Sequence, residues 1–204
     1  MSTVTTTDQH KDARQRIRES RLGTLVVLGV TGALVMGLAY LISRPSVSAS
    51  GTSAVTLSGP SNGAPPKVGA PAQDFTAMTV DGKPVSLSDY QGQAVWLTFG
   101  ATWCAACQAE APDIQATYEK HQAQGAVVLA IFISEDPATV KDYADRVGLT
   151  FPKIGDSDTA IASAYRVNGI PVHFFIDRSG VLRQIVTGAM TPERMDAAIA
   201  AVSR

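Results

Sequence analysis

The chain has 204 residues, with 17 basic and 18 acidic side chains and a formal net charge of -1. A charge this close to zero gives no overall attraction to nucleic acid or to acidic partners, so a general polyanion-binding role is excluded. Apolar residues make up 45% of the chain, which is typical of a globular domain, and the length allows one domain of ordinary size with extensions.

The N-terminal third divides into segments of unlike composition. Residues 1–21 are polar and rich in arginine, residues 22–42 carry no charge, and residues 44–67 are mostly Ser, Gly, Pro, Ala and Thr. At about 1.5 Å per residue, a helix made of the uncharged run reaches about 30 Å, the thickness of a hydrocarbon core. The sequence therefore predicts a cytoplasmic basic tail over 1–21, a transmembrane helix or uncleaved signal anchor over 22–43, and a flexible linker over 44–67.

Basic side chains set the expected orientation of this segment. The arginines cluster before the uncharged run and only Arg44 follows it closely, so the N-terminus is expected in the cytoplasm. The alternative is a secreted protein, because the small residues at 47–51 would allow signal cleavage after Ala49. Both interpretations predict a folded domain outside the cytoplasmic membrane.

Residues 68–204 form the predicted folded domain, which is long enough for one sizeable core. Its first half contains alternating strand and helix signals. The expected elements are two short strands around a turn at Asp81-Gly82, a buried strand over 94–99, a helix from about Cys104 to Gln124, and a second buried strand over 126–133.

The second half of the domain continues this alternation. We expect a helix opened by Asp136 and closed by Gly148, because Asp is a favoured N-cap and Gly a favoured C-terminal cap. The remaining expected elements are a short extended piece over 151–156, a helix from 156 or 157 to 165, strands over 172–177 and 181–186, and a helix over 191–202. Strands alternating with helices predict a mixed sheet covered on both faces.

Both cysteines of the chain lie in the segment "FGATWCAACQAEAP", residues 99–112. Cys104 is expected at or near a helix N-terminus, where unpaired backbone N–H groups and the helix dipole stabilise a thiolate. Cys107, one turn further along, is suited to attack a mixed disulfide on Cys104 and release the partner. The spacing predicts a nucleophile and a resolving thiol in one motif.

Two other interpretations of the cysteine pair compete with this one. A structural disulfide is compatible with a location outside the cytoplasm, but the loop it closes is too small to constrain the unfolded chain much. A zinc site needs about four ligands, and the only other soft donors are His10, His121 and His173. Redox chemistry is therefore the favoured interpretation.

Two longer stretches carry a family resemblance. The segments "TFGATWCAACQAEAP" and "NGIPVHFFIDRSGVLRQIVTG" resemble the thioredoxin superfamily, and more narrowly the membrane-anchored, extracytoplasmic TlpA/ResA-like thiol–disulfide oxidoreductases. The opening "VGAPAQDFTAMTVDGKPVSLSDYQGQAVWL" is similar to that branch and to its redoxin and peroxiredoxin relatives. The resemblance covers about residues 68–202. It implies a thioredoxin-like three-layer α/β/α sandwich with a mixed sheet and an N-terminal β-hairpin extension, preceded by one transmembrane helix.

The resemblance also implies roles for single residues around the catalytic cysteines. Pro171 matches the family's cis-proline, which lies beside the disulfide and, with Ile170, helps to bind a partner's backbone. Trp103 matches the aromatic residue that flanks the nucleophile. Pro112 matches the proline inside the active-site helix, where its role is structural.

Glu110 stands where ResA-like proteins have an acid. Thioredoxins proper instead carry a buried Asp at the position of Thr98, which has no acid–base function at neutral pH. A partly buried carboxylate at Glu110 is expected to move the proton of Cys107; an exposed helix residue is the alternative. His173 replaces a small polar residue of the relatives, and is expected either to touch the thiolate or a partner, or to pack in the interior.

The resemblance implies an enzyme that exchanges disulfides with extracytoplasmic protein substrates. The expected direction is reduction, as in cytochrome c maturation, with a membrane thiol-electron donor as second partner. No cofactor is expected beyond the redox-active Cys104–Cys107 disulfide, no metal, and no nucleic-acid partner.

Three alternatives stay open at this point. The Ala105–Ala106 pair between the cysteines tunes the redox potential and departs from the family's usual residues, so a disulfide-donating oxidase is one alternative. A thiol peroxidase is the second, although Ala101 stands where peroxiredoxins carry Thr or Ser. The third is a Sco-like copper-binding chaperone with His173 as distal ligand, although those proteins have three residues between the cysteines.

Overall fold

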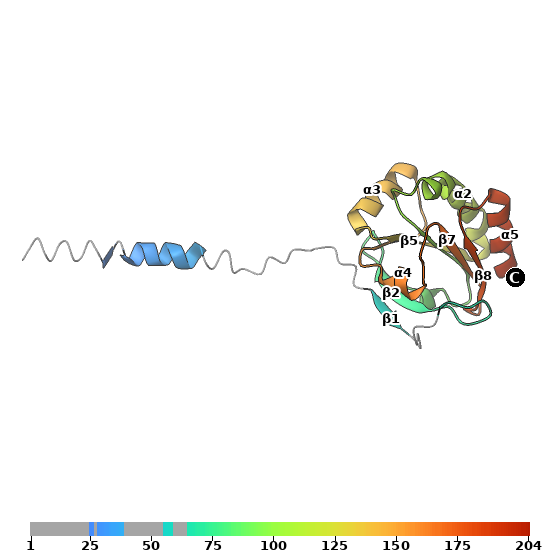
Figure 1. Ribbon diagram of the computed structural model, residues 1–204, viewed down its shortest axis with the longest axis horizontal. Helices are drawn as coiled ribbons and strands as arrows, with labels where there is room; N and C mark the ends of the chain where they lie inside the picture. Colours follow the sequence, from blue (N-terminus) through green and yellow to red (C-terminus); the bar gives the residue numbers. More distant parts are fainter. Residues whose placement is uncertain (1–24, 27, 39–54, 59–64) are drawn as a thin grey trace, which may run out of the picture. The chain divides into compact units, whose positions relative to one another are not determined.

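The computed structural model describes residues 25–26, 28–38, 55–58 and 65–204 (Figure 1). Residues 25–26 and 28–38 are helical. Within the described residues, no helix is both long enough and apolar enough to cross a membrane. The predicted tail over 1–21, the ends of the predicted anchor over 22–43, and the candidate cleavage site lie outside the described residues.

The folded domain contains two sheets. A small antiparallel sheet has the order β1-β2-β3, formed by Thr56–Ser58, Asp74–Met78 and Pro84–Ser86. The main sheet has the order β6-β5-β4-β7-β8, formed by Lys153–Asp156, Ala126–Ile133, Ala94–Gly100, Val172–Ile176 and Leu182–Thr187. Strands β4, β5 and β6 are parallel, whereas β7 and β8 are each antiparallel to their neighbour. The predicted mixed sheet is therefore confirmed.

Helices cover the main sheet unequally. The helices of the described domain are η1 (Leu87–Tyr90), α2 (Ala105–His121), η2 (Gln122–Gln124), α3 (Pro137–Val147), α4 (Ala160–Ala164) and α5 (Pro192–Val202). One core cluster joins α2, α3 and α5 to the face of the sheet that includes Trp96 and Val128. A second cluster joins α4 and the small sheet to the opposite face, which includes Leu97 and Ile131. The second covering layer is thus part helix and part strand.

The helix predicted to start at 156 or 157 begins later, at Ala160. Asp156 is the last residue of β6 and is fully buried. Its carboxylate accepts hydrogen bonds from the backbone N–H groups of Ile161 at 3.2 Å and Ala162 at 2.9 Å. Burial raises the pKa of Asp156, and these N–H groups act in the opposite direction. The prediction was wrong because this acid belongs to a strand and reaches across to the helix.

Strand β1 lies inside the segment predicted as a flexible linker. Thr56–Ser58 pairs antiparallel with β2, so that Leu57 stands opposite Phe75. This pairing gives the outer edge of β2 a backbone partner. The folded part of the chain therefore includes residues before Val68, while the wider assignment of 44–67 as a linker stays a prediction.

Candidate active site

The disulfide sits at the first turn of α2. Cys104 is the N-cap residue of this helix, and it is bonded to Cys107 with a Cα–Cα distance of 5.2 Å. The backbone N–H of Cys107 donates to the Cys104 sulfur at 3.2 Å. The prediction that Cys104 lies at the helix start is confirmed. After reduction, the same N–H and the helix N-terminus favour a Cys104 thiolate.

Cys104 and the residue before it differ in exposure to solvent. Cys104 is only 9% exposed, whereas the side chain before it, Trp103, is 64% exposed. A nearly buried nucleophile next to a large exposed aromatic side chain suits contact with another protein.

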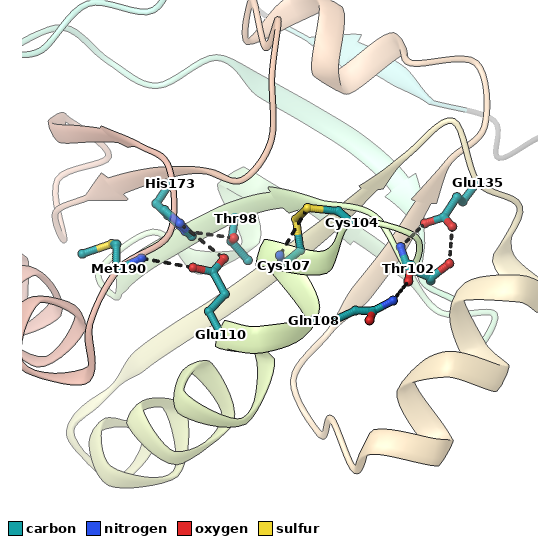
Figure 2. Close-up of a disulfide and its surroundings, with 9 residues drawn as sticks. All are labelled: Thr98, Thr102, Cys104, Cys107, Gln108, Glu110, Glu135, His173 and Met190. Carbon is teal, nitrogen blue, oxygen red and sulfur yellow. Dashed lines mark hydrogen bonds and ion pairs between the residues drawn. A yellow bond between two sulfur atoms is a disulfide. The ribbon is translucent and has the colours of Figure 1, made fainter.

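Two clusters of side chains flank the disulfide. Figure 2 shows Glu110, His173, Thr98 and Met190 on one side of it, and Thr102, Gln108 and Glu135 on the other. On the second side, the buried carboxylate of Glu135 accepts from the backbone N–H of Thr102 at 2.8 Å and from the Thr102 hydroxyl. The Gln108 amide donates to the Thr102 carbonyl oxygen. These contacts fix the loop that leads into Cys104.

Glu135 was missed by the sequence analysis. It lies two residues after the end of β5, with Ser134 between them, and β4 and β5 are parallel neighbours. Their carboxyl ends therefore meet at one edge of the sheet, where the loop from β4 carries Cys104. An acid in the short loop that follows a buried strand, next to the strand that leads into the cysteines, was the available signal.

The peptide bond between Ile170 and Pro171 is cis, as the resemblance implied. Pro171 directly precedes β7, whose first residue, Val172, pairs with Phe99 near the end of β4. Because β7 runs antiparallel to β4, Pro171 lies at the same edge of the sheet as the cysteine loop. Its carbonyl oxygen accepts from Gly188 N–H at 2.8 Å.

Glu110 is buried, with 4% of its surface exposed, so the exposed-residue interpretation is wrong. Its Oε2 accepts from the backbone N–H of Met190 at 3.2 Å. Its Oε1 lies 3.5 Å from Nε2 of His173. The carboxyl group thus stands one helical turn after Cys107, with polar partners on the side away from the sulfur (Figure 2).

A small cavity of about 30 Å³ connects Cys107 and Glu110. Such a volume has room for a water molecule. Its other lining residues are Thr98, Gly100, Ala101, Ala111, Ile114, Ala130, Ile131, Phe132, Tyr143, Leu149 and Phe151. Burial raises the pKa of Tyr143, so its phenol stays protonated there. Gly100 lies against Cys107, since a Cβ at its position would stand 3.4 Å from Cys107 Cβ and Sγ, in ordinary van der Waals contact.

His173 is fully buried, so it packs in the interior rather than meeting a partner protein. Its Nδ1 lies 3.3 Å from Trp96 Nε1 and 3.0 Å from the Thr98 hydroxyl, and its Nε2 faces Glu110. Both ring nitrogens are directed at these groups and not at the sulfurs (Figure 2). A Sco-like copper ligand would instead have a ring nitrogen directed at the sulfurs. Among the described residues, no group of three or more His, Cys, Asp or Glu side chains forms a cluster that could hold a metal ion.

The fold and the site together define a thioredoxin-like architecture. The sheet is mixed, a helix begins at the redox disulfide, and a cis-proline precedes the adjacent antiparallel strand. Within that class, the chain belongs to the AhpC/TSA family, which it matches over residues 68–185.

Individual relatives agree with this assignment. The chain is 39% identical over 129 residues to the thiol-disulfide oxidoreductase ResA of Geobacillus kaustophilus, covering 63% of this chain and 74% of that protein. It is 33% identical over 123 residues to ResA of Bacillus subtilis, covering 60% and 69%. A crystal structure of a putative thiol:disulfide interchange protein DsbE from Chlorobium tepidum superposes with a TM-score of 0.64 at 27% identity, covering 68% of this chain and 99% of that one.

These findings identify the chain as a redox enzyme, a thiol–disulfide oxidoreductase. Its redox group is the Cys104–Cys107 disulfide. Thiol–disulfide oxidoreductases act on protein thiols.

Proposed function

We propose that this chain is a membrane-anchored reductase of extracytoplasmic protein disulfides. The observation that carries the proposal is the Cys104–Cys107 disulfide at the N-cap of α2. A helix N-terminus favours the thiolate of Cys104 over its thiol, which makes Cys104 the attacking group.

The reaction proceeds in two exchanges. The Cys104 thiolate attacks one sulfur of the substrate disulfide, forming a mixed disulfide and releasing the first substrate sulfur as a thiolate, which takes up a proton. Cys107 then loses its proton and attacks the Cys104 sulfur, which releases the second substrate sulfur in the same way. The substrate disulfide gains two electrons, and the Cys104–Cys107 pair is oxidised to a disulfide.

Glu110 is the proposed proton acceptor for Cys107 in the second exchange. It is buried, it follows Cys107 by three residues on α2, and both residues line the same cavity. A general base needs to reach the proton directly or through one water, and the cavity has room for such a water. In the reverse direction, the same carboxyl group returns the proton to the leaving Cys107 thiolate.

Trp103, Ile170 and Pro171 are the proposed contact residues for a protein partner. Trp103 is largely exposed beside Cys104 and Ile170 is half-buried. The register of β7 against β4 supports a common location for these residues at one edge of the sheet. The exposed ring of Trp103 at that end of the sheet suits contact with a partner chain.

Each turnover consumes two electrons, so a reductase outside the membrane needs a donor. A membrane protein that passes electrons through thiols is the proposed donor, and the proposed substrates include the cysteines of apocytochrome c before haem attachment. The uncharged run over 22–42 is the proposed anchor, with the basic tail over 1–21 in the cytoplasm.

Trapping tests the proposed catalytic roles. In the full-length chain, Cys107→Ser should accumulate a mixed disulfide with a disulfide-bonded peptide, because no thiol remains to resolve it. Cys104→Ser should form no such adduct at comparable speed. Equal adduct formation by both variants, or peroxide consumption that outpaces disulfide reduction, would contradict the proposed function.

Thiol labelling on intact cells tests the proposed location. After mild reduction, a membrane-impermeant maleimide should label the cysteines of the full-length chain from outside. The control carries Ser2→Cys together with Cys104→Ser and Cys107→Ser, and its single thiol should be protected until the cells are permeabilised. Protection of the wild-type cysteines, or extraction of the protein from membranes by alkaline buffer, would refute the corresponding part of the proposal.

A further inference from the structure

The Glu110–His173 pair contains a ring nitrogen, Nε2 of His173, that has no role in the two exchanges described above. Nε2 of His173 is buried and makes no hydrogen bond in the described structure. It lies 3.5 Å from Glu110 Oε1, and the two side chains are 0% and 3% exposed. A buried N–H without a partner is unfavourable, so this arrangement calls for an explanation.

The tautomer of His173 follows from its other nitrogen. The indole N–H of Trp96 points at Nδ1 with an N–N distance of 3.3 Å. An indole nitrogen is a donor only, so Nδ1 must be the acceptor and carry no hydrogen. The hydrogen of the neutral ring is therefore on Nε2, facing the Glu110 carboxyl group. Thr98 reinforces this state, since its hydroxyl can also donate to Nδ1 at 3.0 Å.

We propose that His173 is a positioning residue for the thiol–disulfide exchange: its Nε2–H orients Glu110 and stabilises the carboxylate that accepts the Cys107 proton. The inference deepens the proposed function and rests on the role of Glu110 given there. Hydrogen bonds of catalytic groups are often long in the resting protein and tighten in the reacting complex, which accounts for the separation of 3.5 Å in the disulfide state.

Two donors then hold the two oxygens of one carboxyl group. Met190 N–H donates to Oε2 at 3.2 Å, and His173 Nε2–H is directed at Oε1. Donors to a carboxylate favour its charged form over the carboxylic acid. A hydrogen on Nδ1 of His173 is unfavourable, because it would face the indole N–H of Trp96 in a fully buried site.

The charged surroundings of the pair are few. The titratable groups that line the cavity are Cys107 and Glu110 from α2 and Tyr143 from α3. Strand β4 contributes the uncharged Trp96 and Thr98, and the segment before α5 contributes a backbone N–H. Among the residues that line the cavity, Glu110 is thus the one carboxyl group able to take a proton from Cys107.

Transfer of the Cys107 proton adds no oxidation or reduction to the two exchanges described above. When Cys107 is deprotonated, its proton passes to the Glu110 carboxylate, and the Cys107 electron pair forms the bond to Cys104 while the substrate sulfur leaves. Loss of His173 removes the donor that faces Oε1 of Glu110, which leaves the backbone N–H of Met190 as the one described donor to this carboxylate. Glu110 is then less available as a base.

Single-turnover exchange with dithiobis-nitrobenzoate tests this inference on the reduced full-length chain. The reagent releases one coloured thiol when Cys104 attacks and a second when Cys107 resolves the mixed disulfide. The chain has only two cysteines, so the second, concentration-independent release reports the Cys107 step alone. Its rate is measured as a function of pH for each variant.

For His173→Phe, the midpoint of this pH profile should move upward by about one unit. The second release should then be roughly tenfold slower below the midpoint and near wild type at high pH. His173→Gln, which keeps an amide N–H near the position of Nε2, should restore most of the shift. The matched variant His173→Asn, whose amide lies near the position of Nδ1, should behave like His173→Phe. Thermal unfolding of each variant checks that it is folded.

Glu110→Gln separates this inference from the proposed function. In that background, His173→Phe should produce no further change of the pH profile. If Glu110→Gln alters the second release but no His173 variant does, only the positioning role of His173 is overturned. If Glu110→Gln leaves the profile unchanged, the base assigned under the proposed function is wrong as well. An equal slowing at every pH would show that His173 merely packs.

Discussion

The loop before Cys104 depends on one carboxylate, and removing it should be measurable. Glu135 is 7% exposed and accepts two hydrogen bonds from Thr102, one from its backbone N–H at 2.8 Å and one from its hydroxyl. Hydrogen bonds to a charged group contribute about 1.5–3 kcal/mol each. Thr102 is half-buried, so water can partly replace the lost acceptor. We therefore expect Glu135→Ala to lower the free energy of unfolding by about 2–4 kcal/mol.

Glu135→Gln refines this prediction, because its amide keeps one acceptor oxygen but loses the charge. Its expected cost is about 1–2 kcal/mol. Asp142→Asn is the matched control, since it also removes one negative charge but from an exposed position on α3. This control should stay within about 0.5 kcal/mol of wild type.

Urea unfolding at constant redox state measures these differences. Amide hydrogen exchange of Thr102 provides a local readout, and its protection should fall in Glu135→Ala. The reasoning is refuted if Glu135→Ala unfolds at the wild-type urea concentration and Thr102 keeps its protection, because the two hydrogen bonds would then contribute nothing.

Three further changes test other parts of the domain by unfolding. Gly155→Ala should cost about 1–3 kcal/mol, because its Cβ would stand 2.8 Å from a backbone oxygen; an equal loss in Gly169→Ala, which has open space, would contradict this. Burial alone would raise the pKa of Asp177, but hydrogen bonds from a serine hydroxyl, an arginine and two backbone N–H groups lower it to about 2. Because that pKa lies below the unfolded value near 4, the stabilisation is complete above about pH 4 and disappears toward pH 2. Asp177→Asn should therefore be less stable at neutral pH and show a weaker acid dependence; an unchanged dependence rejects the assignment. Tyr165→Phe should cost about 1 kcal/mol, since its hydroxyl donates to the Gln73 carbonyl oxygen at 2.6 Å; wild-type stability would show that this contact is dispensable.

Local patterns predicted the elements that border the site. The apolar run at 94–99 became β4, and the cysteine spacing located the start of α2 because N-capping depends on neighbouring residues only. The Asp136 cap and the glycine stop at Gly148 are confirmed for the same reason. Such signals act within a few residues, so the sequence carries them directly.

Contacts between distant segments were harder to predict. Asp156 reads as a helix cap in sequence, yet it is buried at a strand end and bonds to residues further along. Glu135 contacts Thr102 across 33 positions, and His173 meets Thr98 across 75. These pairings depend on the order of strands in the sheet, which single-residue patterns do not encode.

The reduction potential of the Cys104–Cys107 pair tests the central claim most directly. It is measured on the full-length chain by equilibration with glutathione or dithiothreitol buffers, scoring the fraction of disulfide by alkylation. A reductase predicts a value near about -250 mV or lower, in the range of thioredoxin. A value near about -120 mV, as in a strong disulfide donor, would contradict the account and assign the chain to the oxidation of exported proteins.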